Sequence, residues 1–244
     1  MTKRNRSTVA DNRAEKKQAT GRVIKEKFID EIKPPITAKT EVQKEFLAAL
    51  KTHDVVAFSA PAGCGKSILA MSEASDWLKK GIYDKITLTR AVIPMGRSLG
   101  MLPSTLQQKF EPYLMPLLEV LWTRYGKNYY ENCLQLGSIE LLAPEYARGR
   151  SVSGVFIIDE AQSMYPEELY TMLTRMETGS KLILIGDPNQ SDIKGLNGID
   201  WLCKFVEKNP ELEEHIKVIK ATSDDIVRSG LCKKMVIAKE REVK

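Results

Sequence analysis

The stretch DVVAFSAPAGCGKS, residues 54–67, decides the fold. Residues 55–58 are consecutive apolar residues without helical spacing, and Pro61 and Gly63 interrupt the chain soon after them. An apolar run of this kind, stopped by proline and glycine, is typical of a buried strand that enters a tight loop. We therefore predict a strand, a loop and a helix that begins near Lys66.

The loop matches the phosphate-binding pattern at every position but the first, where alanine stands in place of glycine. Gly63 and Gly65 allow backbone N–H groups to turn toward an anion, which the positive end of the following helix also attracts. We predict that Lys66 reaches the β and γ phosphates of a nucleotide and that the Ser67 hydroxyl binds Mg²⁺. A glycine turn followed by an unrelated lysine is the alternative. The loop residues are Ala60, Pro61, Ala62, Gly63, Cys64, Gly65, Lys66 and Ser67.

Length and composition favour one α/β domain with a tail, because the chain has 244 residues and an ordinary share of apolar and charged residues. No apolar run approaches the roughly 20 residues that cross a bilayer, and the basic start lacks the apolar segment of a secretory signal. We therefore expect a cytoplasmic protein without a membrane contact. Four scattered cysteines and two histidines form no zinc pattern, so we expect no structural metal.

The positive net charge lies at the N-terminus. Residues 1–33 contain ten basic residues (Lys and Arg) and five acidic residues (Asp and Glu). The rest of the chain has 27 basic and 27 acidic residues and so carries no net charge. We place a basic arm at residues 1–35, partly helical or disordered, and one α/β domain at residues 36–240. The arm either attracts a phosphate backbone or is a solvated tail without a partner.

Apolar runs alternate with amphipathic segments along the domain, which predicts a parallel sheet with helices on both faces. The helix over 105–125 is interrupted near Pro112 and Pro116. Tyr125, Tyr129 and Tyr130 near its end either stack on single-stranded bases or, as is commoner, are buried. The expected strands are 55–58, 85–90, 139–143, 155–158, 182–185 and 216–219, and the expected helices are 37–50, 66–79, 105–125, 166–177, 199–207 and 224–239.

Two further strand ends carry polar residues of the kind that nucleotide hydrolysis needs. Asp159 and Glu160 follow the apolar run 155–158, where an aspartate can hold Mg²⁺ and a glutamate can orient or deprotonate the attacking water. Gln190 follows the run 182–185 in the segment GDPNQ, and its amide can both donate to and accept from a γ phosphate or its water. A helix-capping Asp–Glu pair and an ordinary Asp-Pro-Asn turn are the alternatives.

The motifs APAGCGKS, LTRAVIPMGRSLGMLPSTLQQKFEPYLMPL, LLAPEYARGRS, IIDEAQSM, IGDPNQSDI and DDIVRSG occur in the order seen in PhoH-like proteins. Over about residues 36–235 the chain resembles a short, phage-type member of that family. The resemblance implies a RecA-like P-loop ATPase related to superfamily 1 helicases. It also implies ATP and Mg²⁺ as cofactors, RNA or single-stranded DNA as partner, and a homo-oligomeric, hexameric ring.

The same resemblance implies roles for individual residues. Gln43 resembles the glutamine that reads adenine, and Arg228 resembles an arginine supplied to the phosphates of a neighbouring subunit. Arg90 and Arg97 resemble part of a nucleic-acid track. Lys66, Ser67, Asp159, Glu160 and Gln190 take the phosphate, metal, water and sensing roles named above.

Two other functions remain open from the sequence, a nucleoside or nucleotide kinase and an ATP-binding switch that does not hydrolyse. Thymidine kinases share a strand followed by DEAQ, although they usually carry zinc-binding cysteine pairs. Cys64 suggests a smaller hypothesis, since a thiol at a helix start can have a lowered pKa and oxidise readily. The alternative for Cys64 is a small, tolerated side chain.

Overall fold

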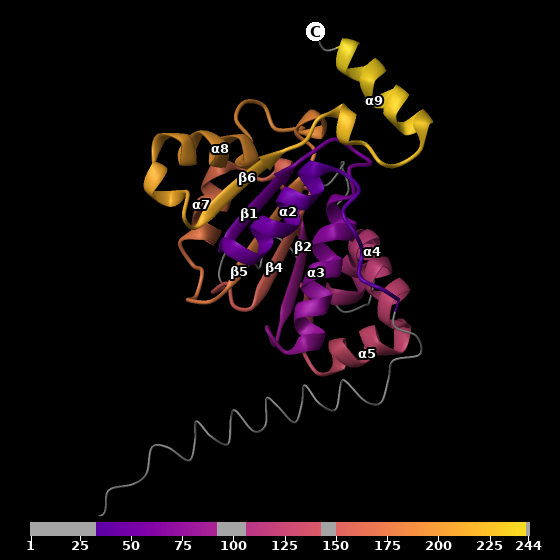
Figure 1. The fold of residues 1–244 in the computed structure, drawn as a ribbon. Coiled ribbons are helices and arrows are strands. Elements are labelled where there is room, and N and C mark those ends of the chain that lie inside the picture. Colours follow the sequence, from indigo (N-terminus) through magenta and orange to yellow (C-terminus); the bar gives the residue numbers. More distant parts are fainter. Residues whose placement is uncertain (1–32, 92–105, 143–149, 243–244) are drawn as a thin grey trace, which may run out of the picture.

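Six parallel strands form the centre of the fold in this computed structural model, which describes residues 33–91, 106–142 and 150–242. The strands lie in the order β3-β2-β4-β5-β1-β6 (Figure 1). Their bounds are β1 Val55–Ser59, β2 Ile86–Arg90, β3 Ile139–Leu141, β4 Val155–Asp159, β5 Lys181–Gly186 and β6 Ile216–Lys220. Because the strands are all parallel, their carboxyl ends meet at one edge of the sheet, as predicted.

Helices cover both faces of the sheet (Figure 1). One face packs against α2 Glu41–Thr52, α3 Lys66–Lys80, α4 Leu106–Tyr125 and α5 Lys127–Gln135. The other face packs against α7 Pro166–Leu173 and α8 Gly198–Lys208. Helix α9, Gly230–Glu242, projects away from the sheet (Figure 1). Short 3₁₀ turns are η1 Ala161–Ser163, η2 Pro188–Gln190, η3 Pro210–Leu212 and η4 Ser223–Asp225.

Alternate side chains of the central strands supply two separate cores, because successive residues of a strand point to opposite faces. Val56 and Phe58 of β1 pack with the α2 and α3 side, whereas Val55 and Ala57 pack with α7 and α8. Phe46 of α2 stacks on Phe58 with ring centroids 4.6 Å apart. Both faces being buried explains why the run that leads into the loop is apolar throughout.

Two local caps define the ends of the helices that flank β1. The Thr40 hydroxyl accepts a hydrogen bond from the Gln43 amide at 3.2 Å and so caps α2. Gly81 takes a left-handed conformation with φ of 72° and ends α3. These ends fix the helices before and after the loop at residues 60–65.

The predicted interruption of the helix over 105–125 is wrong, because α4 continues through Pro112 and Pro116. A proline removes one backbone donor and displaces the carbonyl four residues earlier. Both prolines lie on the exposed side of the helix, where water can satisfy the freed carbonyl groups.

Two other predicted helices are shorter than expected. The segment 166–177 is helical only to Leu173, since Glu177 donates its backbone N–H to the Val152 carbonyl at 2.9 Å instead of continuing the helix. The segment 224–239 begins as the turn η4, and its helix starts only at Gly230. Between them Val227 donates its N–H to the Gly63 carbonyl at 3.1 Å, which holds the chain in an extended form against the loop.

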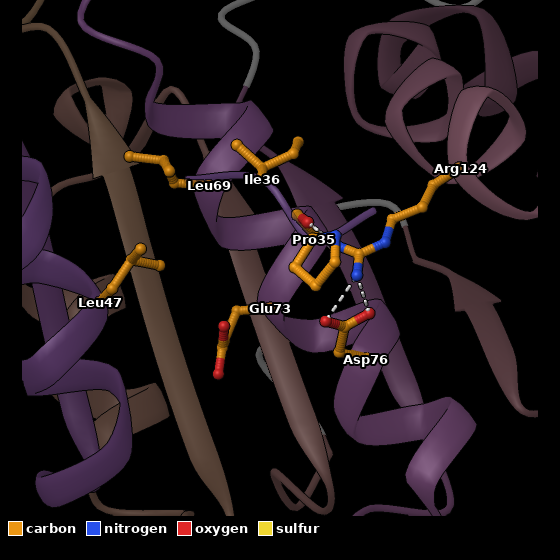
Figure 2. Close-up of a pocket in the computed structure, with 8 residues that line it drawn as sticks. Pro35, Ile36, Leu47, Leu69, Glu73, Asp76 and Arg124 are labelled. Carbon is orange, nitrogen blue, oxygen red and sulfur yellow. Dashed lines mark hydrogen bonds and ion pairs between the residues drawn. The ribbon is translucent and has the colours of Figure 1, made fainter. Parts of the chain in front are cut away.

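The three tyrosines near the end of α4 are buried, with 0–2% of their surface exposed, so the base-stacking alternative is wrong. The Tyr125 hydroxyl donates to Asp76 of α3, which also forms an ion pair with Arg124 at 2.6 Å (Figure 2). The Arg124 carbonyl accepts a hydrogen bond from the Lys33 amide at 3.1 Å. The described chain therefore enters the domain along the α3–α4 contact, close to the boundary predicted between residues 35 and 36.

No helix among the described residues is both long and apolar enough to span a bilayer. The basic arm, apart from residues 33–35, lies outside the described residues, and so does Arg97.

Candidate nucleotide-binding site

The loop between β1 and α3 has the backbone that the phosphate-binding pattern requires. Gly63 and Gly65 adopt φ of +91° and +81°, a region that residues with a Cβ rarely enter. A Cβ on Gly63 would also lie 3.0 Å from the Cβ of Arg228. Gly65 is the N-cap of α3 and has no side chain to occupy the first amides of the helix, which leaves them for an anion.

Lys66 folds back over this loop, as a lysine that binds phosphate should. Its Nζ donates to the carbonyls of Ala60 at 2.5 Å and Pro61 at 3.0 Å. Burial lowers the pKa of Lys66, while the nearby Asp187 carboxylate opposes the shift. The ammonium group is therefore partly desolvated, which strengthens its attraction for a phosphate that enters the loop.

Asp159 and Ser67 are a donor set that suits Mg²⁺, which in proteins is usually bound by one or two carboxylates together with substrate phosphates. Asp159 ends β4 and is only 5% exposed, and Ser67 lies in the first turn of α3. Burial raises the pKa of Asp159 to about 6, although the Arg90 guanidinium opposes the shift. Burial makes the ionised form of this carboxylate unfavourable, and a bound cation would stabilise it.

Replacing Asp159 with asparagine is expected to raise the melting temperature of the ligand-free protein by several degrees near pH 7.5. A folded-state pKa near 6 lies above the unfolded value of about 4, so the ionised carboxylate costs about 3 kcal/mol at neutral pH. That cost is complete above pH about 6 and vanishes below pH about 4. Thermal unfolding should therefore show a gain for D159N near pH 7.5 that shrinks near pH 5.

The exposed Asp192 provides the matched control, since D192N removes the same charge from a side chain that is not buried. If D159N melts at a lower temperature than the wild-type protein at both pH values, burial does not penalise the Asp159 carboxylate as described.

Glu160 is the only described residue other than glycine with a positive φ, at 53°. Such a conformation costs of order 1 kcal/mol and is found where a side chain must be aimed in one direction. Its carboxylate accepts from Arg90 Nη2 at 2.6 Å through Oε1 and from Gln162 Nε2 at 2.7 Å through Oε2. The structure thus joins Glu160 to Arg90, a residue expected on a nucleic-acid track.

Gln190 is tied to the phosphate-binding loop through Asp187, which the sequence indicated only as part of a turn. Asp187 Oδ2 accepts from Gln190 Nε2 at 2.6 Å and from the Ala62 amide at 3.0 Å. The backbone N–H of Asp187 donates to Gln162 Oε1 at 3.0 Å. A continuous series of hydrogen bonds therefore connects the Glu160 carboxylate, just after β4, with the turn after β5 and the loop after β1.

Gln162 is a residue of the candidate site that sequence reasoning missed. It is 2% exposed, and its amide joins Glu160 to the Asp187 backbone, as described above. One signal is the glycine at position 186, because a Cβ there would clash with Gln162 Oε1. The sequence pattern around Gly186 indicates only a turn, since it does not show which distant side chain passes close to that backbone.

Gln43 is hydrogen-bonded to the backbone of the loop at Cys64. Gln43 is 3% exposed and donates from Nε2 to the Cys64 carbonyl at 2.9 Å, while its Oε1 accepts from the Lys39 amide at 2.6 Å. The predicted adenine contact of Gln43 stays a prediction. Burial raises the pKa of the Cys64 thiol to about 11, which is the opposite of what the redox hypothesis needs.

Arg228 is exposed and lies in the non-helical segment before α9, not on the helix where it was expected. Its backbone passes against Gly63 of its own chain. The structure therefore brings Arg228 to the carboxyl edge of the sheet, where Lys66, Asp159, Glu160 and Gln190 also lie.

A parallel sheet with a glycine loop, a half-buried lysine and carboxylates at its carboxyl edge defines a P-loop nucleotide-binding protein with a RecA-like fold. Residues 35–240 match the family model described as PhoH-like protein, and the chain belongs to this family. The resemblance seen in the motifs is thereby confirmed.

Curated relatives agree with this assignment. The PhoH-like protein of Bacillus subtilis is 37% identical over 209 residues, which are 85% of this chain and 65% of the relative. Protein PhoH of Escherichia coli is 32% identical over 212 residues, which are 84% of this chain and 58% of the relative. The chain thus spans about three fifths of the length of these relatives.

Solved structures support the fold. The large terminase of a thermophilic bacteriophage superimposes with a TM-score of 0.50 at 14% identity, over 81% of this chain and 49% of the terminase. At this level of identity the likeness concerns the fold alone.

Proposed function

We propose that this chain binds ATP with Mg²⁺ at the carboxyl edge of the sheet and hydrolyses it. The observation that carries the proposal is the hydrogen-bonded chain from Glu160 through Gln162 and Asp187 to Ala62 of the loop. It joins the residue that would activate water to the loop that would hold the phosphates. A purely structural turn would not need this connection.

Each residue then has a chemical task. The N–H groups of the loop and the Lys66 ammonium bind the phosphates, and Ser67 with Asp159 would hold the Mg²⁺ that neutralises their charge. Glu160 orients or deprotonates the attacking water, and Gln190 contacts the γ phosphate. The adenine contact is assigned to Gln43, whose amide is bonded in the free protein to the Cys64 carbonyl and the Lys39 amide.

We propose single-stranded RNA or DNA as the partner whose binding is coupled to hydrolysis. Arg90 lies at the carboxyl end of β2, directly beside β4, the strand that leads into Asp159 and Glu160. The basic excess of residues 1–33 and Arg97 add cationic groups for a phosphate backbone. The salt dependence of binding measures how many phosphates are neutralised.

We also propose that a second copy of the chain completes the site within a hexameric ring. One P-loop domain supplies one phosphate-binding loop, and an arginine contributed by a neighbour is worth about 10³ to 10⁵ in rate in P-loop enzymes. Arg228 is exposed at the nucleotide edge and is the arginine proposed for this role.

The rate of ATP hydrolysis per subunit is therefore expected to rise steeply with protein concentration. Measurement from the nanomolar to the micromolar range, alongside light scattering, tests this prediction. A mixture of K66A and R228A chains should regain part of the activity that each lacks alone, since one chain supplies the arginine and the other the loop. A rate per subunit that stays constant, or a mixture that stays inactive, contradicts the shared site.

Reaction products separate the remaining functions. Hydrolysis yields ADP and inorganic phosphate, a nucleoside kinase yields a phosphorylated nucleoside, and a binding switch yields neither. Product analysis with labelled ATP, in the presence and absence of nucleosides, distinguishes the three.

A further inference from the structure

The ion pair between Arg90 and Glu160 occupies the carboxylate that the proposed reaction needs. Arg90 Nη2 lies 2.6 Å from Glu160 Oε1, while Gln162 holds the other oxygen at 2.7 Å. A general base must accept a proton from a water within its own hydrogen-bonding reach. With one oxygen bound to a cation and the other to an amide, Glu160 is held away from this task.

Arg90 is also placed to exchange Glu160 for another anion. Its side chain is 24% exposed at the end of β2, and its contact with Asp159 is long, at 3.8 Å from Nε to Oδ2. Nη1 donates to the backbone carbonyl of Tyr113 in α4 at 2.9 Å. The guanidinium is therefore anchored from the side of α4, while its ion pair with Glu160 is partly open to solvent, so another anion can reach the guanidinium and compete for it.

The surface beside Arg90 favours a single-stranded nucleic acid as the competing anion. Tyr113 is 41% exposed, and its ring stacks on Phe110 with centroids 6.1 Å apart. Because Arg90 contacts the backbone carbonyl of Tyr113, an exposed aromatic residue and an arginine belong to the same part of the surface. Proteins bind single strands by stacking bases on aromatic rings while nearby cationic groups bind the phosphates. A small free anion would make no use of the ring.

We propose that Arg90 binds either Glu160 or a phosphate of a single strand, so that strand binding releases Glu160 to activate water. The proposal rests on the hydrolytic function proposed above and explains how a partner would stimulate it. Arg90 acts through Glu160 and is a positioning residue. Binding couplings are reciprocal, so a change that removes the Glu160 contact of Arg90 must raise the affinity of the protein for the single strand.

The reciprocal effect can be measured without hydrolysis. In nucleotide-free protein, E160A should bind a short single-stranded uridine or deoxythymidine oligonucleotide about five-fold more tightly than wild type. The gain should disappear in the R90A background, where E160A/R90A binds no better than R90A. Fluorescence anisotropy gives both affinities.

Glu140 provides the matched control, because it forms ion pairs with Arg150 and Lys85 on the β3 side of the sheet. E140A removes the same charge and should not reproduce the gain. Equal tightening by E160A and E140A, or an E160A gain that persists without Arg90, overturns the proposal. Unchanged binding by E160A overturns it as well.

Hydrolysis gives the second readout. R90A should raise the rate without nucleic acid several-fold and lose most of the stimulation by the oligonucleotide, and R90K should restore part of the stimulation. A basal rate that falls or is unchanged in R90A overturns the exchange but leaves the hydrolytic function standing. Absence of turnover in every variant and condition contradicts the hydrolytic function, and the binding experiment then still decides whether Arg90 exchanges partners.

Discussion

Replacing Lys66 with alanine is expected to weaken ATP binding at least about 100-fold and to abolish detectable hydrolysis. In the free protein the Lys66 ammonium is held over the loop by two carbonyls and is partly desolvated. Hydrogen bonds to charged groups contribute about 1.5–3 kcal/mol each, so losing the contact with the β and γ phosphates costs roughly this factor in affinity. Calorimetric titration with a non-hydrolysable ATP analogue and Mg²⁺ measures it.

The control for Lys66 is the exposed Lys51 in the last turn of α2, where K51A removes the same charge. K66A should keep a melting temperature close to that of wild type, since Lys66 forms its bonds within its own loop. Analogue affinity that is the same in K66A and K51A contradicts the role assigned to Lys66.

Replacing Glu160 with glutamine is expected to reduce hydrolysis about 100-fold or more while ATP binding is retained. Glutamine has the same shape, so it can keep its contact with Gln162, but it cannot accept the proton of the attacking water. General bases typically contribute 10² to 10⁴ in rate. Single-turnover measurements separate this loss from any change in binding.

Normal turnover by E160Q would show that another group activates the water. Because Glu160 is ion-paired with Arg90 in the free protein, the variant should be compared with and without nucleic acid. The loss should be largest in the stimulated state, where the carboxylate is free.

Much of the fold could be predicted because its signals are local. The apolar run 55–58 and the glycines of the loop depend on neighbours in the sequence, and both appear in the structure as expected. The errors arose where distant contacts decide. The two prolines of α4 are tolerated because they lie on the side of the helix that faces water. The last helix starts later than predicted because the Val227 N–H is hydrogen-bonded to the Gly63 carbonyl.

The candidate site shows the same division. Lys66, Asp159, Glu160 and Gln190 follow strand ends, and a parallel sheet necessarily gathers such positions at one edge. Gln162 and Asp187 are different, because their importance lies in hydrogen bonds to residues far along the chain. The pairing of Arg90 with Glu160 likewise follows from β2 and β4 being neighbours, an order that apolar patterns do not specify.

The most direct test is a structure of the chain with Mg²⁺ and a non-hydrolysable ATP analogue. We expect the terminal phosphate to contact the Lys66 ammonium, with Mg²⁺ between the Ser67 hydroxyl and the Asp159 carboxylate and with Gln190 facing the γ phosphate. An analogue bound elsewhere on the domain, with its terminal phosphate distant from these four side chains, would contradict the assignment of this edge as the catalytic site.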